Sequence, residues 1–321
     1  MQSLPTKQDL GVLTDELTRP CLIPLVVNKE GCRDPVKTFM GLRENFDNSF
    51  LLESLASPGE GSRYSVIGCD PLLHLRIIDG EVHIDGNPKF VKASRDRIES
   101  PFGFEDELDV LKRAMFMDDM RVFGLNIPRY VFGVTGYVGY DFVDSLYGVG
   151  PSKKADVKTP TLEFVLPGSV IVFDHLEYET YYASLMLFLD DEGYGETYRS
   201  SQEALDDLME VEGKETRNKT EEISTSSNID REAFEEIVQK AKKYVREGDV
   251  IQAVLSRRIN LSPAPDPETF YSKLRQVNPS PYMFFLDFSD KSVIGSSPEA
   301  LLRVKDGRAM TRPIAGTRKR G

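Results

Sequence analysis

The sequence predicts an α+β fold, with largely antiparallel β-sheets and flanking helices. The clearest hairpin signal is Asp79-Gly80, which separates two apolar runs and tolerates the backbone conformations of a tight turn. A second predicted strand pair, Ser169–Asp174 and Tyr178–Leu189, is also separated by a short connection. Segments with helical spacing occur elsewhere, without the regular strand–helix alternation of a parallel sheet.

The first part of the chain reads mainly as strands. Tyr64–Ile67, Leu72–Ile78 and Glu81–Ile84 are three successive strand candidates. Phe132–Tyr140 combines glycines with aromatic residues, which indicates a strand that another backbone approaches closely. Glu105–Met115 carries apolar residues at helical spacing and predicts a helix.

A polar stretch at residues 210–228 predicts a linker between two domains, at residues 1–209 and 229–321. Asp230 is expected to cap the first helix of the second domain, and Gly248 to end it. The apolar stripe of this helix, which we expect to face inward, consists of Phe234, Ile237, Val238, Ala241 and Val245.

The second domain continues with predicted strands around one more helix. Val250–Leu255 is an apolar, β-branched run of the kind found in central strands. Pro267 suits the first position of a helix, which should stop before Pro279. Tyr282–Phe288 then predicts a strand, and Asp306-Gly307 predicts another hairpin turn.

The composition of the chain argues against some classes of binding partner. The formal net charge is −12, from 40 basic and 52 acidic residues, so phosphate contacts to nucleic acid are not expected. Three cysteines, Cys21, Cys32 and Cys69, form no CxxC pair and predict free thiols. The first residues lack an apolar signal core, and no apolar run approaches membrane-spanning length. We therefore expect a cytoplasmic protein that binds neither membrane nor nucleic acid.

General catalytic motifs do not identify a reaction for this sequence. The spacing of Gly133, Gly136 and Gly139 is not the dinucleotide-binding fingerprint and does not open a helix. The three histidines lie in predicted strands or turns, where structural roles are more common than metal ligation. Residue types alone thus leave the reaction undefined.

Five segments, read together, resemble the large subunit (component I) of anthranilate synthase, a chorismate-utilising family. They occur in the family's order: Leu51-Leu52-Glu53-Ser54 with Arg63–Gly68; Gly248–Arg258; Asn278–Phe285; Ser296-Ser297-Pro298-Glu299; and Arg312–Arg318. The resemblance implies an N-terminal regulatory domain over residues 1–209 and the first part of a chorismate-binding domain over 229–321. The family continues well beyond the segment that ends here at Gly321, so the resemblance implies a fold incomplete at its C-terminus.

The resemblance also implies a reaction. Chorismate and ammonia would give anthranilate and pyruvate in tryptophan biosynthesis, with ammonia from a glutamine amidotransferase subunit (component II) and Mg²⁺ in the complete enzyme. Glu299 would act as a general acid, and Gly316 and Thr317 would bind chorismate, with Thr317 also at the reacting centre. No metal ligands are expected in this chain, because the family's ligands correspond to positions beyond Gly321. The chain alone is therefore expected to be inactive.

A second implied site is regulatory. In the resemblance, Glu53, Ser54, Pro281, Tyr282 and Met283 bind L-tryptophan, the feedback inhibitor. Tyr282 and Met283 offer an aromatic face and a soft apolar surface to an indole, and Glu53 can hold an ammonium group.

Two positions bear on which chorismate enzyme this is. Relatives that add water carry a lysine where this chain has Gln252, whose amide cannot act as a base. Aminodeoxychorismate synthases typically carry a lysine where this chain has Ala315, which has no nucleophile. Both positions favour anthranilate chemistry. Aminodeoxychorismate synthase, isochorismate synthase and a non-catalytic tryptophan-binding fragment remain the alternatives.

Overall fold

The computed structural model describes residues 3–16, 20–55, 63–99, 106–124, 127–148, 157–189, 194–216, 222–305, 307–311 and 313–314. The chain forms two compact units. The first combines Met1–Glu215 with Leu274–Gly321, and the second is Thr216–Lys273. This grouping differs from the predicted division, in which residues 229–321 stayed together. The functional domain boundaries remain a prediction.

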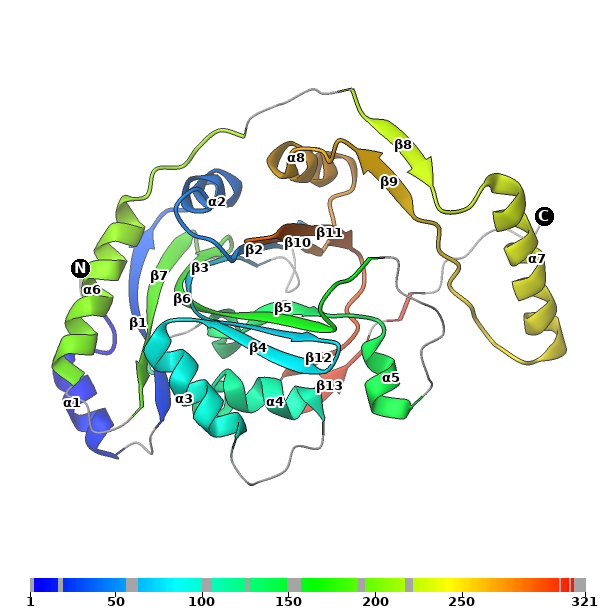
Figure 1. Ribbon diagram of the computed structural model, residues 1–321. Helices are drawn as coiled ribbons and strands as arrows, with labels where there is room; N and C mark the ends of the chain where they lie inside the picture. Colours follow the sequence, from blue (N-terminus) through cyan, green and yellow to red (C-terminus); the bar gives the residue numbers. More distant parts are fainter. Residues whose placement is uncertain are drawn as a thin grey trace. The chain divides into compact units, whose positions relative to one another are not determined.

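The first unit contains most of the secondary structure (Figure 1). Its helices are α1 (Lys7–Glu16), α2 (Pro35–Leu42), α3 (Pro88–Ile98), α4 (Glu107–Ala114), α5 (Phe142–Tyr147) and α6 (Tyr194–Glu210), with short 3-10 turns η1 (Met117–Asp119) and η2 (Arg129–Phe132). Its strands are β1 (Cys21–Glu30), β2 (Ser49–Glu53), β3 (Tyr64–Ile78), β4 (Glu81–Gly86), β5 (Thr135–Val138), β6 (Leu162–Asp174), β7 (Glu179–Phe188), β10 (Tyr282–Phe288), β11 (Lys291–Ser297), β12 (Arg303–Lys305) and β13 (Arg308–Met310).

A nine-stranded sheet organises this unit. Its order is β1-β7-β6-β3-β2-β10-β11, with β4 paired to β3 and β5 paired to β6. Every pairing between these strands is antiparallel. The predicted α+β class with antiparallel sheets is therefore confirmed. The β10–β11 hairpin, which comes late in the chain, completes a sheet begun by early strands.

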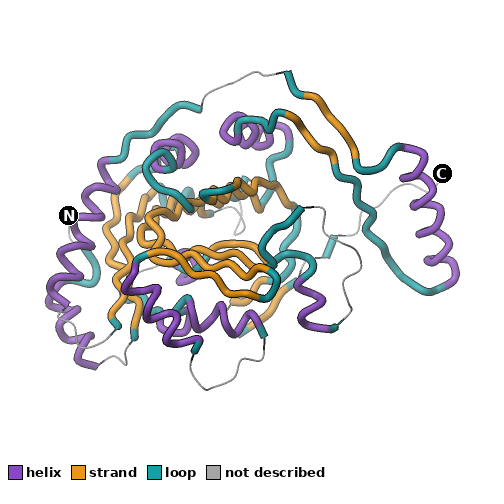
Figure 2. The backbone as a smooth tube through the Cα atoms, viewed as in Figure 1, coloured by secondary structure: helices purple, strands orange, loops and turns teal. Residues whose placement is uncertain are grey.

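Helices cover both faces of the sheet (Figure 2). On one face, Phe50, Val172 and Leu286 join Leu111 and Met115 of the α4 region in one buried apolar cluster. On the other face, Phe39 of α2 packs edge-on against Phe285 of β10, with ring centroids 5.1 Å apart. Complete burial of one such side chain contributes about 1.5–3 kcal/mol, so residues from β10 stabilise both layers.

The Asp79-Gly80 turn forms as predicted. Both residues have positive φ, 51° and 81°, as a two-residue hairpin between β3 and β4 requires. The two strand candidates before it are one continuous strand, β3, whose register shifts between Pro71 and Leu73. A bulge lets one long strand bend where the sequence suggested a break.

Gly136 confirms the predicted close approach of two backbones. It lies on β5 opposite Phe164. A Cβ at this position would come within 1.9 Å of the carbonyl oxygen of Glu163. Glycine is required here because any side chain would push β5 away from β6.

A buried carboxylate ties β11 to the middle of the sheet. Glu163 of β6 accepts from Tyr137 at 2.8 Å, pairs with Lys291 at 2.8 Å and lies 3.0 Å from Nε2 of His74. Burial alone would raise the pKa of Glu163, but hydrogen bonds from His74, Lys291 and Tyr137 outweigh it and lower the pKa. Lys291 stands at the start of β11, so this ion pair fixes the hairpin in place.

The second unit contains α7 (Arg231–Glu247) and a two-stranded sheet of β8 (Ser224–Ser227) and β9 (Ile259–Ser262). Asp230 caps α7 by accepting from the backbone N–H of Ala233, and Gly248 ends the helix at φ 85°, as predicted. The predicted inward stripe is not buried, since Ile237 is 40% exposed. One further helix, α8 (Pro267–Val277), begins in this unit and ends in the first.

The predicted central strand at Val250–Leu255 is wrong. These residues have no strand pairing, and Ile251 and Val254 are 99% and 87% exposed. A central strand needs a neighbour on each edge. Within the described part of this unit, β8 and β9 pair with each other. An apolar, β-branched run does not reveal whether such neighbours are present.

We expect Gly136→Val to lower the free energy of unfolding by about 2 kcal/mol or more, because the new side chain would overlap the β6 backbone. The matched control is Gly195→Ala in α6, where an added Cβ meets no atom within 4 Å. The control should be neutral or slightly stabilising, since alanine favours helix. Urea unfolding of both variants measures the difference. Equal stability would contradict the assigned close approach.

Candidate functional site

The sheet brings together the two segments that the sequence linked to an amino-acid ligand. Strand β2 pairs with β10, and Glu53 lies directly opposite Met283. The pairing continues past the strand ends, where the N–H of Leu55 donates to the carbonyl of Ser280 at 3.0 Å. The motif that contains Glu53 and the motif that contains Met283 are therefore joined by one short stretch of antiparallel strand pairing.

Glu53 is the most deeply buried charged group at this contact. Its side chain is 1% exposed and forms a two-pronged ion pair with Arg275, near the end of α8. Arg275 Nε donates to Oε2 at 3.0 Å, and Nη2 donates to Oε1 at 3.1 Å. Arg275 itself is 34% exposed. Such a fork fixes the orientation of the carboxylate. Sequence reasoning missed Arg275.

A histidine lies beside this pair. His175 Nε2 is 2.8 Å from the hydroxyl of Ser65, a buried residue of β3. Burial lowers the pKa of His175; the negative charges of Glu53 and Asp174 oppose this shift, and Arg275 adds to it. The neutral imidazole is therefore favoured. Neither Ser65 nor His175 stood out in the sequence.

The other predicted ligand residues lie around Glu53 in different orientations. Ser54 directly follows β2, and Pro281 directly precedes β10; both are partly exposed. Tyr282 and Met283 are neighbours on one strand, so their side chains point to opposite faces. Met283 is 1% exposed and Tyr282 is 41% exposed. Of these two residues, Met283 shares the face of Glu53.

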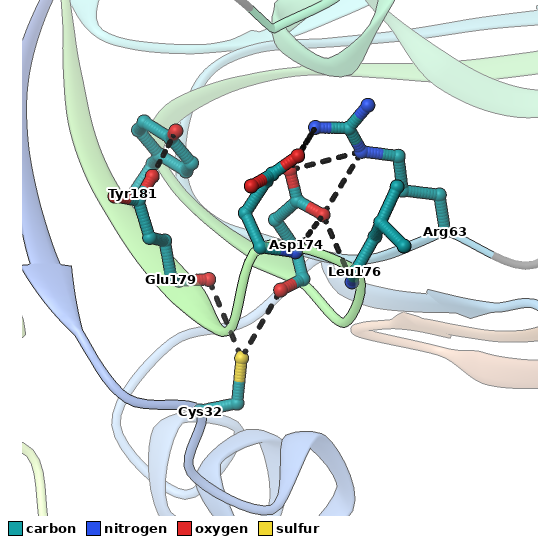
Figure 3. Close-up of polar contacts among 7 residues, drawn as sticks. Cys32, Arg63, Asp174, Leu176, Glu179 and Tyr181 are labelled. Atoms are coloured by element: carbon teal, nitrogen blue, oxygen red, sulfur yellow. Dashed lines mark hydrogen bonds and ion pairs between the residues drawn. The ribbon is translucent and has the colours of Figure 1, made fainter.

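A network of hydrogen bonds holds the turn that carries His175 (Figure 3). Arg63 Nε and Nη2 donate to the buried carboxylate of Asp174 at 2.9 and 2.6 Å. Burial alone would raise the pKa of Asp174, but Arg63 and the backbone N–H groups of Glu177 and Leu176 outweigh it and lower the pKa. Cys32 Sγ donates to the carbonyls of Asp174 and Glu179, each at 3.4 Å (Figure 3). The turn is thus fixed by the Arg63–Asp174 ion pair and by Cys32, which follows β1.

The candidate acid Glu299 follows β11. Its backbone N–H donates to the Ser297 hydroxyl at 3.3 Å, and that hydroxyl donates to the Glu299 carbonyl at 3.2 Å. The residue is partly buried. Gly316, Thr317 and Ala315 lie outside the described residues. Gln252 belongs to the second unit, where it is exposed in an irregular segment.

The described part of the chain contains no cluster of three or more His, Cys, Asp or Glu side chains that could hold a metal ion. We therefore assign no residue of these described ranges to a metal ion and derive no chemical step through one. Within the same ranges, no helix combines the length and the apolar character needed to cross a membrane.

Comparison with known families defines the class of this chain, which is that of the chorismate binding enzymes. The chain belongs to the chorismate binding enzyme family, whose model matches residues 60–321. Component 1 of anthranilate synthase from Lactococcus lactis subsp. lactis (strain IL1403) is 32% identical over 293 residues, covering 89% of this chain and 59% of the relative. The same component from Aquifex aeolicus (strain VF5) is 34% identical over 311 residues, covering 94% and 60%. The predicted family membership is confirmed.

Solved structures agree in fold. Anthranilate synthase component I from Streptococcus pneumoniae TIGR4 has a TM-score of 0.53 at 24% identity and covers 79% of this chain and 54% of its own. MenF, the menaquinone-specific isochorismate synthase of Escherichia coli, has a TM-score of 0.52 at 13% identity, covering 92% and 56%. The chain spans about 60% of the length of its curated relatives.

We expect Asp174→Asn to destabilise the protein by about 2 kcal/mol at pH 7, because it removes one charge of a buried pair whose partner is partly exposed. The pKa of Asp174 is lowered in the folded state, so its contribution is present above the unfolded pKa and is lost as pH falls through the folded pKa. The stability gap between wild type and variant should therefore shrink below about pH 4.

The control is Asp85→Asn, which removes a partner of Arg76 whose side chain is 61% exposed. Such a surface pair contributes about 0–1 kcal/mol. Chemical unfolding from pH 3 to pH 7 compares the two variants. If the difference in unfolding free energy between wild type and Asp174→Asn stays constant with pH, Asp174 does not stabilise the fold through its charge.

Proposed function

We propose that this chain belongs to the large subunit of an anthranilate synthase, which converts chorismate and ammonia to anthranilate and pyruvate in tryptophan biosynthesis. The observation that carries the proposal is the 32–34% identity to component 1 proteins over about 90% of the chain. The structural likeness does not distinguish anthranilate synthase from isochorismate synthase, because solved structures of the two match this chain about equally well. Shared fold alone does not define the reaction.

Two side chains favour anthranilate among the possible products. Gln252 has an amide that cannot take a proton from water at neutral pH, which disfavours isochorismate formation. Ala315 offers no nucleophile to form a covalent adduct with the ring, which disfavours aminodeoxychorismate chemistry. Ammonia would then attack the ring directly.

The remaining roles follow from the residue chemistry. Glu299 would protonate the departing hydroxyl as a general acid, and Gly316 and Thr317 would bind the anionic substrate through close backbone approach and a hydroxyl donor. In the complete enzyme, Mg²⁺ would neutralise and orient a substrate carboxylate. A glutamine amidotransferase subunit would supply ammonia, and the reaction would take place in the cytoplasm.

The same proposal includes feedback inhibition by L-tryptophan at Glu53, Ser54, Pro281, Tyr282 and Met283. Two motifs that are far apart in the sequence meet in the β2–β10 pairing. The buried Glu53 supplies a negative charge for the ligand's ammonium, and Met283 lies opposite with an apolar side chain. These features support the regulatory role.

We expect Ser54→Phe in the full-length protein to raise the tryptophan concentration for half-maximal inhibition at least about tenfold, since an aromatic ring next to Glu53 would occupy ligand space. Ser54→Ala removes the hydroxyl without adding bulk and should have a smaller effect. Inhibition curves of anthranilate formation measure both variants. If Ser54→Phe responds to tryptophan like wild type, Ser54 does not line the inhibitor site.

Product analysis tests the reaction itself. The full-length protein, supplied with chorismate, Mg²⁺ and an ammonium salt, should release fluorescent anthranilate and an equal amount of pyruvate. Gln252→Lys should not increase this yield, because a lysine there favours attack by water. Accumulation of isochorismate or of 4-amino-4-deoxychorismate in the wild-type reaction would overturn the proposed function.

A further inference from the structure

We propose that the second unit binds the remaining part of a chorismate binding enzyme, and that it does so when that part is a separate polypeptide. The proposed interface consists of the apolar stripe of α7 and the run at residues 250–255. The inference goes beyond the proposed function, because it rests on family membership and on exposed apolar surface and not on the identity of the product.

The second unit is built from elements that have little stability on their own. None of the residues of α7, β8 or β9 is buried. Among residues 222–273, all of which the structure describes, Tyr271 of α8 is the one buried hydrophobic side chain. A 17-residue helix and a two-stranded sheet are each marginally stable in water without tertiary packing. The unit therefore needs a further surface against which to bury its apolar side chains.

Two neighbouring segments carry the exposed apolar residues. Ile237 and Val245 on the stripe of α7 are exposed, as are Ile251 and Val254 in the run that follows the helix. Residues 250–255 have the β-branched composition of a strand, yet they pair with no strand in the described part of the chain. Exposed apolar residues that gather in adjacent segments mark an interaction site.

The lengths of the relatives indicate what covers this surface. The family model matches residues 60–321, so the whole second unit lies within the matched region. In the Lactococcus lactis relative, 293 matched residues make up 59% of the protein, so about 200 of its residues have no counterpart in this chain. A segment of that length has the size of a domain. It is long enough to pack against α7 and to place strands beside residues 250–255.

A second copy of this chain fits the surface less well. The formal net charge is −12, so two copies repel each other. A second copy also presents the same incomplete unit. Pairing the two runs would give each of them one neighbouring strand, whereas a central strand has two. The remainder of the enzyme is therefore the better occupant.

The test mixes the 321-residue chain with a separately expressed fragment of Aquifex aeolicus component 1, the stretch that follows the region matched by this chain. Calorimetry should show a dissociation constant of about 1 µM or lower, as expected for an interface of standard size. Hydrogen exchange should show new protection at residues 250–255, because these residues gain strand neighbours. The positive control is the same fragment mixed with the matched part of the A. aeolicus protein.

Two variants locate the interface. Ile251→Asp and Val254→Asp should each weaken the association at least about tenfold, because the new carboxylate would be buried without a partner. The matched control is Val12→Asp in α1, at a position that is also exposed but lies in the first unit. Its affinity should equal that of wild type. All three positions are exposed in the free chain, so urea unfolding should show each variant as stable as wild type.

Every outcome decides the inference. Association that protects residues 250–255 and is weakened by Ile251→Asp supports it. The inference is wrong if the fragment does not bind, whether or not the positive control associates, or if neither aspartate variant weakens binding. It is also wrong if this chain alone forms a dimer that Ile251→Asp disrupts, because the occupant is then a second copy.

A separate readout addresses the proposed function. The associated parts are supplied with chorismate, Mg²⁺ and an ammonium salt, and anthranilate is measured. Association without anthranilate formation would leave this inference intact and would count against the proposed function.

Discussion

The pairing of β10 with β2 is the contact on which the rest of the first unit depends. It joins parts of the chain that are more than 200 residues apart, since Met283 pairs with Glu53, 230 residues earlier (283 − 53). Bringing such distant segments together costs chain entropy, which must be offset by packing. Phe285 and Leu286 of β10 provide that packing, one against α2 and the other in the cluster beneath α4. Without this strand, both layers would lose buried apolar surface.

Buried charges give this arrangement its register. Glu53, Glu163 and Asp174 have side chains that are at most 1% exposed, and each is paired with a cation that stays between 23% and 34% exposed: Arg275, Lys291 and Arg63. Pairs of this kind add little net stability compared with apolar residues, but removing one partner leaves an uncompensated charge and costs about 2 kcal/mol where the remaining cation is partly exposed. A shift of β11 by one residue would break the pair between Glu163 and Lys291. The same charges that fix the sheet therefore also fix the carboxylate of the candidate ligand site.

Local signals in the sequence predicted local structure well. Asp79-Gly80, the caps of α7 at Asp230 and Gly248, and the glycine on β5 each depend on neighbouring residues, and each is confirmed. Strand order and ion-pair partners depend on distant residues, which explains why Arg275 was missed. The strand predicted at Val250–Leu255 failed for the same reason, because apolar character does not reveal whether neighbouring strands exist. The motifs did predict that Glu53 and Met283 belong to one site, and the structure brings these residues together.

The β10–β11 hairpin also links the two proposed sites by a short route. Met283 faces Glu53 on one edge and pairs with Ser296 of β11 on the other. The next residue, Ser297, exchanges hydrogen bonds with the backbone of Glu299. A ligand that binds differently in two positions of β10 would shift the equilibrium between them, and β11 would carry the displacement to the candidate acid. Coupling of this kind is reciprocal, so substrate bound near Glu299 would in turn weaken the inhibitor. Under the proposed function, feedback inhibition would require two positions of the open end of this hairpin, whose turn is tied by Lys291 to Glu163.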